Sequence, residues 1–414
     1  MPREITRCRI CGNRTLVPLL SLGEQPLSGV FPRDQSEQPT SGPLELVKCD
    51  GGDACGLVQL RHSYDSAEMY GAGYGYRSSL NKTMVEHLQA KVEKLRRKVA
   101  LNSGDIVLDI GSNDGTLLSF YPTEAVCVGM DPTAAKFREF YRGHIHVIPE
   151  FFSGAAFKAH FGSGRARIVT SIAMFYDLED PTAFVRQVAE ILDDEGVWHF
   201  EQSYLPAMLS QNAYDTVCHE HVEYYSLAQI RWMLDRCGLK IIAIETNDVN
   251  GGSFAVTAAK SSSSFPEDTA AVRAMMKSEH DQGLHTLKPY HEFRERVFHH
   301  RDKLLATLAD ISRHGAKVLG YGASTKGNVI LQFCSITTAQ IPFIADVNPD
   351  KFGKVTPGTC IPIISEADAH AMKPDYLLVM PWHFRDNLVQ REAAYLQRGG
   401  KMIFPLPEIE IVGR

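Results

Sequence analysis

The chain has 414 residues, of which 44% are hydrophobic and 22% are charged, and its formal net charge is −6. This composition is typical of a soluble globular protein, and the length exceeds what one hydrophobic core organises, so two or three domains are expected. The negative charge disfavours nucleic acid as a partner, and the sequence lacks both an apolar run of ~18–20 residues and a signal peptide, so we expect a cytoplasmic monomer or homodimer without membrane contact.

Four cysteines near the N-terminus predict a metal site: Cys8, Cys11, Cys49 and Cys55. The first two form a C-x-x-C knuckle that lets both thiolates reach one ion, and the more widely spaced second pair completes a tetrahedral set. In a reducing compartment such thiols are ligands or buried groups rather than disulfides. We therefore expect structural zinc in a module of residues 1–62, with metal-free reduced cysteines or a redox C-x-x-C as alternatives.

A glycine–tyrosine loop and a helix follow the cysteine module. The loop, residues 70–76, carries three tyrosines and is either a simple turn or a lid that lines a binding site. The apolar spacing from Met84 to Leu95 predicts a helix with one buried face. Either Ser78 or Asn81 is expected to cap its N-terminus.

Residues 105–115 are the most informative stretch, because an apolar strand ends there in Asp109 and breaks into a turn rich in glycine. A strand, a glycine turn and a helix at residues 116–121 would begin a nucleotide-binding βαβ unit. The spacing is not the dinucleotide pattern G-x-G-x-x-G, and Asp109 and Asp114 would repel a diphosphate. The two acids favour a cationic or hydroxyl-rich ligand instead.

The next strand, residues 125–130, ends in Asp131, which can accept both hydroxyls of a ribose. Together the two strand ends resemble the S-adenosylmethionine site of a class I methyltransferase, and an ordinary βαβ turn with incidental acids is the alternative. The candidate cofactor contacts are Asp109, Gly111, Asn113, Asp114, Gly115, Asp131, Pro132 and Met174.

Strands and helices continue to alternate up to residue 260, which predicts a central domain of residues 63–260. Strands are expected at 168–173, 196–201, 240–245 and 253–260, with a helix from Pro181 to residue 192. Before the last strand, the turn Asn250-Gly-Gly-Ser253 could offer backbone N–H groups to an anion.

Residues 261–414 are expected to form a C-terminal domain. Helical spacing from Ala270 to His314 is interrupted at Pro289. In a second α/β unit, residues 317–327 run from a strand into a glycine turn that holds Lys326. Further strands are expected at 341–345, 374–380 and 401–404. The turn lacks the dinucleotide spacing, so Lys326 either serves a phosphate or belongs to a packing turn.

Titratable side chains are concentrated in residues 215–226, a run that contains His219, Glu220, His221, Glu223, Tyr224 and Tyr225. Histidine titrates near pH ~6.5 and can take a proton at neutral pH, and a neighbouring carboxylate would orient it. The run therefore favours a general base over a catalytic metal, since its spacing is not H-E-x-x-H. Surface residues that cap a helix at Ser226 are the remaining alternative.

In this order, the motifs resemble the nucleotide-sugar C-methyltransferases, which methylate C3 of 4-keto-deoxysugars. The run His219–His221 and the turn at residues 320–327 are the most specific parts of a resemblance that covers nearly the whole chain. It implies an α/β fold, with a class I (Rossmann-like) methyltransferase domain flanked by an N-terminal zinc module and a C-terminal Rossmann-like domain. It also implies S-adenosylmethionine and structural Zn²⁺ as cofactors, and a nucleotide-diphosphate keto-deoxysugar as substrate.

The same resemblance implies roles for individual residues. His221 is the implied base, which removes the proton beside the ketone before the methyl group moves to that carbon. His219, Glu220 and Tyr76 are further catalytic candidates. The candidate substrate contacts are Tyr76, Asp177, Glu201, Tyr224, Asn250, Gly252, Ser253 and Lys326.

Two positions depart from relatives: Cys218 stands where some carry a tyrosine, and Asp177 stands where some carry a histidine. Both departures fall at the implied sugar site, so they bear on the substrate and the methylated atom more than on the cofactor. Three other functions stay open. They are O- or N-methylation on the same scaffold, an NAD-dependent activity of the C-terminal glycine turn, and a non-catalytic zinc-bearing binding protein.

Overall fold

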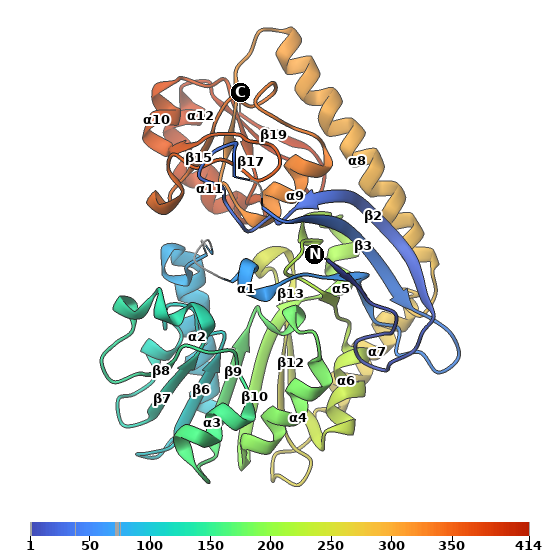
Figure 1. Ribbon diagram of the computed structural model, residues 1–414, viewed down its shortest axis with the longest axis vertical. Coiled ribbons are helices and arrows are strands. Elements are labelled where there is room, and N and C mark those ends of the chain that lie inside the picture. The colour runs from blue at the N-terminus through green and yellow to red at the C-terminus, as the bar shows by residue number, and fades with distance from the viewer. Residues whose placement is uncertain (1, 38, 71–73, 75, 414) are drawn as a thin grey trace.

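The computed structural model describes residues 2–37, 39–70, 74 and 76–413, with the backbone alone for residue 250. The described chain is organised by a seven-stranded, a six-stranded and a four-stranded sheet, with a further two-stranded ribbon. Figure 1 shows the C-terminal and central sheets at opposite ends of the molecule, and the N-terminal strands running beside the long helix α8 (Lys288–Arg313). Among all the residues that the structure describes, no helix is long and apolar enough to cross a membrane.

The central domain is built on the seven-stranded sheet, in the order β12-β13-β10-β9-β6-β7-β8. Its parallel strands are β6 (Ile106–Ile110), β7 (Val126–Met130), β8 (His146–Ile148), β9 (Ala166–Ile172) and β10 (Leu192–Ser203). The strand β13 (Ser253–Lys260) is antiparallel to β10, and β12 (Leu239–Asn247) is antiparallel to β13, so β12 has the same direction as the parallel strands. The strand order reverses at β6, which has β7 on one side and β9 on the other. Ligands of open α/β sheets bind at the carboxyl ends of strands at such a switch point.

Helices α2 (Lys82–Lys98), α3 (Gly154–Phe161), α4 (Pro181–Ile191), α5 (Leu205–Ser210) and α6 (Leu227–Arg236) belong to this domain. The side chain of Asn81 caps α2, as one of the two expected candidates. The predicted helix at 116–121 is wrong, because only the short 3₁₀ turn η2 (Leu118–Phe120) forms. The next residue, Tyr121, precedes a proline, and that position disfavours helical backbone, so the turn cannot be extended.

The N-terminal module forms an antiparallel sheet that the cysteine spacing did not predict. Its strands, in the order β11-β4-β3-β2, are β2 (Leu16–Pro26), β3 (Ser41–Cys49), β4 (Val58–Leu60) and β11 (Glu223–Tyr224). The ribbon of β1 (Arg3–Glu4) with β5 (His62–Ser63) and the short helix α1 (Ser66–Met69) adjoin it. Because β11 comes from the polar run 215–226, that run is hydrogen-bonded directly to the N-terminal module.

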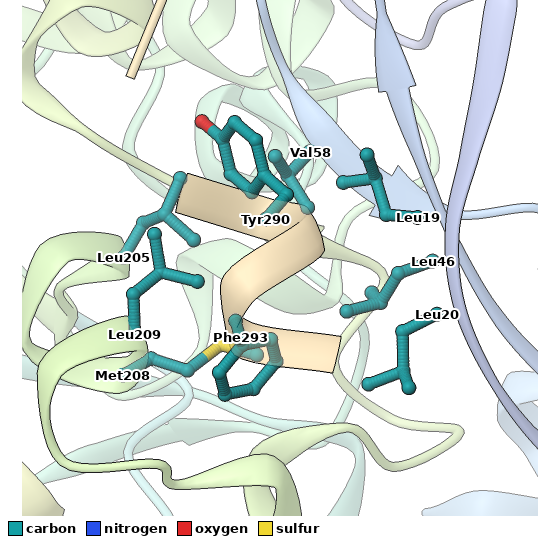
Figure 2. A pocket seen from close by; sticks show the side chains of 9 residues that line it. All are labelled: Leu19, Leu20, Leu46, Val58, Leu205, Met208, Leu209, Tyr290 and Phe293. Carbon is teal, nitrogen blue, oxygen red and sulfur yellow. The ribbon is translucent and has the colours of Figure 1, made fainter. Parts of the chain in front are cut away.

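Apolar side chains of this sheet pack against α5 and α8. Figure 2 shows the residues that meet around a small apolar cavity: Leu19, Leu20, Leu46 and Val58 from the sheet, and Leu205, Met208, Leu209, Tyr290 and Phe293 from the helices. They belong to one hydrophobic core that continues into the C-terminal sheet. The module therefore shares its core with the C-terminal domain, and zinc is not its sole source of order.

The C-terminal domain begins with α7 (Thr269–Asp281) and α8, and Pro289 lies in the first turn of α8, where proline is tolerated. Its sheet has the order β16-β15-β14-β17-β18-β19. The elements are β14 (Val318–Tyr321), α9 (Thr325–Phe333), β15 (Ile344–Asp346), β16 (Ile363–Ser365), α10 (Glu366–Ala371), β17 (Tyr376–Val379), α11 (Arg385–Arg391), α12 (Ala393–Gln397), β18 (Lys401–Phe404) and β19 (Glu410–Val412). A second switch point lies at β14, between β15 and β17.

Candidate active site

The four cysteines converge on one point, as the sequence predicted. Their Sγ atoms all lie within 4.8 Å of one another, and the Cys8–Cys55 and Cys11–Cys49 pairs are each 3.5 Å apart. Four thiolates at this spacing fit a tetrahedral zinc ion, whose Zn–S bonds are ~2.3 Å long. Gln229 of α6 donates a hydrogen bond to the carbonyl of Cys55 at 2.8 Å, which fastens the metal site to the central domain.

The turn after β6 is acidic and allows close approach of a ligand. Asp109 is only 4% exposed, and burial, aided by the charge of Asp131, raises its pKa to about 7. Gly111 has a φ of +73°, and a Cβ there would lie 3.0 Å from the side chain of Met174. Two buried acids beside an open glycine turn fit a ligand that carries a sulfonium charge and ribose hydroxyls. Asp109 and Asp131 would hold S-adenosylmethionine here.

The segment before α2 clamps this turn. The amides of Ser78 and Ser79 donate to Asn113 Oδ1 and Asp114 Oδ2, both at 2.9 Å. Asn113 Nδ2 in turn donates to the carbonyl of Tyr76 at 3.2 Å. The Tyr76 side chain itself is 48% exposed. These bonds fasten the end of the glycine–tyrosine loop to the turn after β6. Residues 71–73 and 75 of the loop lie outside the described chain.

The far side of the turn is equally constrained. Gly115 has a φ of +75°, and a Cβ there would lie 2.7 Å from the ring of Tyr141, so only glycine fits. The Tyr141 hydroxyl donates to the Asn113 carbonyl at 2.7 Å. Asp131 accepts from the Asn113 amide at 2.8 Å and caps the 3₁₀ turn η3 (Pro132–Ala135). These contacts hold the turn in one conformation.

His219, Glu220 and His221 lie in a tight turn, neither helix nor strand, and their side chains have different surroundings. His219 is fully buried and packs edge-on against Tyr64, the residue that follows β5, with ring centroids 4.5 Å apart. Glu220 is buried beneath the loop that leaves β2. The His221 ring lies 4.2 Å from that of Tyr176. Within the described residues, the cluster of potential metal ligands is the set of four cysteines, and these histidines are not part of it.

His221 is held in one tautomer by its surroundings. Its Nδ1 lies 3.0 Å from the carbonyl oxygen of Thr216, and only a protonated nitrogen can donate to a carbonyl, so Nε2 carries the lone pair. The Tyr224 hydroxyl donates to the same carbonyl at 3.2 Å. Burial, followed by the positive charge of Lys326, lowers the pKa of His221 to about 3. The ring is therefore neutral at physiological pH, with Nε2 available as a base.

Two buried carboxyl groups accompany His221. Asp177 ends the 3₁₀ turn η5 (Phe175–Asp177) and accepts a hydrogen bond from the Tyr70 hydroxyl at 2.8 Å. Burial raises the pKa of both Asp177 and Glu220, and the charge of Glu220 adds to the rise at Asp177. Asp177 Oδ1 and Glu220 Oε2 have no hydrogen-bond partner in the part of the chain that is described. Buried polar atoms normally have partners, so these two oxygens are open to a ligand.

Residues at the second switch point, after β14 and β17, lie near His221 and Asp215. Lys326 lies in the first turn of α9, where burial lowers its pKa and the charge of Asp215 opposes that change. Asp215, in η6 (Tyr214–Thr216), accepts a hydrogen bond at 2.7 Å from the indole N–H of Trp382, in the turn after β17. Burial, followed by the charge of Lys326, lowers the pKa of the neighbouring His383. The C-terminal domain thus brings a cation, Lys326, into the surroundings of both His221 and Asp215.

The turn at residues 250–253 has a packing role that its sequence did not indicate. The amides of Gly251 and Gly252 bond to carbonyls of preceding residues, at 3.3 and 3.2 Å, so these two N–H groups are not offered to an anion. A Cβ on Gly251 would lie 3.4 Å from the Trp382 ring, and one on Gly252 would collide with α5 at 2.5 Å. Ser253 donates to a carbonyl within the turn at 2.9 Å. The side chain of Asn250 lies outside the described residues.

Glu201, a predicted substrate contact, lies in an ion-pair network with α2. Its two carboxylate oxygens are each 2.6 Å from a partner, His87 Nε2 and Lys91 Nζ, and Asn247 donates to it at 2.7 Å. Burial alone would raise the pKa of Glu201, but the His87 hydrogen bond and the Lys91 charge outweigh it and lower the value to about 2. The carboxylate is therefore engaged within the protein, which the residue's place at a strand end did not reveal.

Several residues of this region were missed by the sequence analysis. Asp215 lies at the start of the polar run but was given no role. Trp382 and His383 follow β17 in the way that Lys326 follows β14. Because the carboxyl ends of neighbouring parallel strands meet at one edge of a sheet, the position of this pair was the available signal.

A Rossmann-like sheet with an acidic glycine turn at its switch point defines an S-adenosylmethionine-dependent methyltransferase. Residues 84–244 match the methyltransferase domain family, residues 8–70 match a zinc-binding domain family, and residues 248–407 match the C-methyltransferase C-terminal domain family. The chain is 31% identical to the C-methyltransferase NovU of Streptomyces niveus over 419 residues, which cover 99% of this chain and 97% of NovU. The chain belongs to this C-methyltransferase family.

Solved structures of methyltransferases match less than half of the chain. One is a chain from the complex of the Trm112 methyltransferase activator with a methyltransferase of Haloferax volcanii, with 15% identity, a TM-score of 0.37, and coverage of 44% of this chain and 94% of that one. Another is an S-adenosylmethionine-dependent methyltransferase of Clostridium acetobutylicum, with 11% identity, a TM-score of 0.32, and coverage of 42% and 92%.

Proposed function

We propose that the methyl acceptor is a keto-deoxysugar linked to a nucleoside diphosphate, and that His221 is the general base of its C-methylation. The observation that carries the proposal is the fixed tautomer of His221, whose Nδ1 is bound to the Thr216 carbonyl and whose Nε2 is unprotonated. A C–H bond next to a ketone is acidic enough for a neutral imidazole to act on it. A positioned general base contributes roughly 10²–10⁴-fold to the rate, and the lowered pKa of His221, which weakens Nε2 as a base, places its contribution toward the lower end of that range.

The groups around His221 suit the parts of such an acceptor. Nε2 of His221 takes the proton from the carbon beside the ketone, and the electron pair left on that carbon attacks the methyl group. S-adenosylmethionine would supply that methyl group in electrophilic form, with S-adenosylhomocysteine as the leaving group when the bond between sulfur and the methyl carbon breaks. The open oxygens of Asp177 and Glu220 suit sugar hydroxyls, which donate hydrogen bonds. Lys326, at the second switch point, suits the charge of the diphosphate.

The experiment incubates the protein with S-adenosylmethionine and a nucleoside-diphosphate 4-keto-6-deoxyhexose that is deuterated beside the ketone. Transfer to carbon gives a product that has gained one methyl group and lost one deuterium, as measured by mass spectrometry. A methylated product that keeps all its label would instead establish O- or N-methylation on this scaffold.

The role of His221 is tested with His221→Asn, which we expect to abolish turnover while calorimetry shows unchanged S-adenosylmethionine binding. The matched control is His280→Asn, at an exposed position of α7, which should behave as wild type. Near-wild-type turnover by His221→Asn would eliminate His221 as the base.

A further inference from the structure

The loop that follows β2, residues 27–32, touches all three parts of the molecule. Figure 1 shows the N-terminal chain, in blue, reaching the C-terminal domain beyond β2. The contacts of its backbone are Leu27 N with the Thr40 carbonyl at 2.9 Å, Ser28 O with Asn328 Nδ2 at 2.7 Å, Pro32 O with Val355 N at 3.0 Å, and an isolated bridge between Val30 and Tyr74. A loop fixed from three sides has little freedom to move when its neighbours change.

Gly29, in the middle of this loop, is buried against Glu220. A Cβ built on Gly29 would lie 2.0 Å from Glu220 Oε1, 3.3 Å from Glu220 Cδ and 3.3 Å from Thr325 Oγ1 of α9. The φ of Gly29 is outside the left-handed region, so the backbone conformation does not require glycine. Space is what requires it, because the carboxylate of Glu220 occupies the place where a side chain would begin.

The position of Glu220 is therefore set by a residue of the N-terminal module. Burial raises the pKa of Glu220, and the Gly29 amide and the Ser28 hydroxyl are among the groups that act in the opposite direction. With Oε1 against Gly29, the other carboxylate oxygen, Oε2, is the one left without a hydrogen-bond partner in the described chain. Glu220 directly precedes His221, so a displacement of its side chain also disturbs the turn that holds the base.

We propose that Gly29 is a positioning residue of the active site: by lacking a side chain it lets the Glu220 carboxylate lie against the N-terminal loop, and this contact fixes Glu220 relative to His221 and the acceptor. The N-terminal module is then a wall of the active site and not only a folding unit. The effect of Gly29 on catalysis rests on the proposed function, whereas the contact between Gly29 and Glu220 does not depend on it.

The test is Gly29→Ala in the full-length, zinc-loaded protein. Glu220 Oε1 must retreat from 2.0 Å to at least 3.4 Å for an ordinary contact with the new methyl group. A misplacement of about 1 Å can cost roughly 10²-fold in rate, so we expect kcat to fall by about 10²-fold, with an unchanged KM for S-adenosylmethionine. The matched control is Gly143→Ala, an exposed glycine with no atom within 4 Å of the added Cβ, which should leave kcat unchanged.

The double variant Gly29→Ala/Glu220→Asp distinguishes a positioning role of Gly29 from a purely structural one. Glu220→Asp shortens the side chain by one methylene and leaves room for the methyl group, so Gly29→Ala should change kcat by less than about threefold in that background. A Gly29→Ala protein with wild-type kcat, or an equal loss in the Glu220→Asp background, would overturn the proposal.

The failure of the proposed function is distinguishable from these outcomes. If the wild-type protein does not methylate the deuterated acceptor, the proposed function fails by itself. The contact is then judged from thermal unfolding, where Gly29→Ala should lower Tm relative to Gly143→Ala and should do so much less in the Glu220→Asp background. Equal shifts in both backgrounds would show that Gly29 does not hold Glu220.

Discussion

Lys91→Met isolates the value of the buried pair with Glu201, because methionine keeps most of the side-chain volume and removes the charge. The Lys91 and Glu201 side chains are 7% and 4% exposed, and their Nζ and Oε2 atoms are 2.6 Å apart. Removing one partner of a buried pair costs about 3–5 kcal/mol, because the other charge stays buried and uncompensated. Since His87 and Asn247 still contact Glu201, we expect about 3 kcal/mol.

The loss should depend on the charge of Glu201. In Lys91→Met the pKa of Glu201 rises, so the destabilisation should shrink as the pH is lowered from 7 to 5 and the carboxyl takes a proton. The double variant Lys91→Met/Glu201→Gln has no buried charge to compensate and should recover more than half of the loss. Lys94→Met is the matched control, because its pair with Glu245 is on a half-exposed side chain and contributes at most about 1 kcal/mol.

The assay is urea unfolding followed by tryptophan fluorescence, to which Trp198, fully buried in the central sheet, contributes together with the two other tryptophans of the chain. A double variant as unstable as Lys91→Met, or a loss no larger than that of Lys94→Met, would refute this reasoning. Activity supplies a second check. Because Glu201 is engaged inside the protein, the double variant should have the wild-type KM for the acceptor. A tenfold rise in that KM would indicate that Glu201 contacts the substrate after all.

Three further predictions concern the interfaces and the titrating groups. Trp382→Phe should destabilise the protein by about 1–3 kcal/mol, because buried Asp215 loses its indole partner, and a loss as small as that of Trp232→Phe in chemical denaturation would contradict this. Burial lowers the pKa of His199 to about 3, so below pH ~6.5 the unfolded chain binds a proton at this residue and the folded chain does not. Stability therefore falls as the pH falls, and at pH 5 this one histidine costs about 2 kcal/mol of unfolding free energy. His199→Asn should abolish that pH dependence. Removal of zinc by a chelator should lower the Tm, and Cys49→Ser should lower it equally with no further response to the chelator.

The parts of the fold that the sequence predicted are those encoded by local apolar runs. The strand at 401–404 has its predicted bounds, and the strands at 106–110 and 126–130 begin or end within two residues of the expected positions. The N-terminal sheet was not predicted, because one of its strands is a two-residue segment, β11, that pairs with residues far away in the sequence. Local periodicity contains no information about such a pairing.

The candidate site was predicted as a set of residues, but not as an arrangement. The cysteine cluster and the two acidic strand ends follow from spacing, since ligands at a switch point recur in register. The directions of His219 and His221 do not follow, because their turn has neither a helical nor an extended period from which a common face could be predicted. Glu201 is a similar case. A carboxylate at a strand end is equally compatible with a ligand and with a lysine from a neighbouring helix.

The shared core of the N-terminal sheet has a consequence for synthesis on the ribosome. The cysteines and three strands of the module emerge first, but β11 is at residues 223–224 and α8 extends to residue 313. Until α8 has been translated, the apolar sheet residues of Figure 2 lack the part of their cover that Tyr290 and Phe293 provide. Unpaired strand edges and exposed apolar surface make nascent chains prone to aggregation. The first segment to be made is therefore among the last to be completed, because α8 ends only after three quarters of the chain have been synthesised.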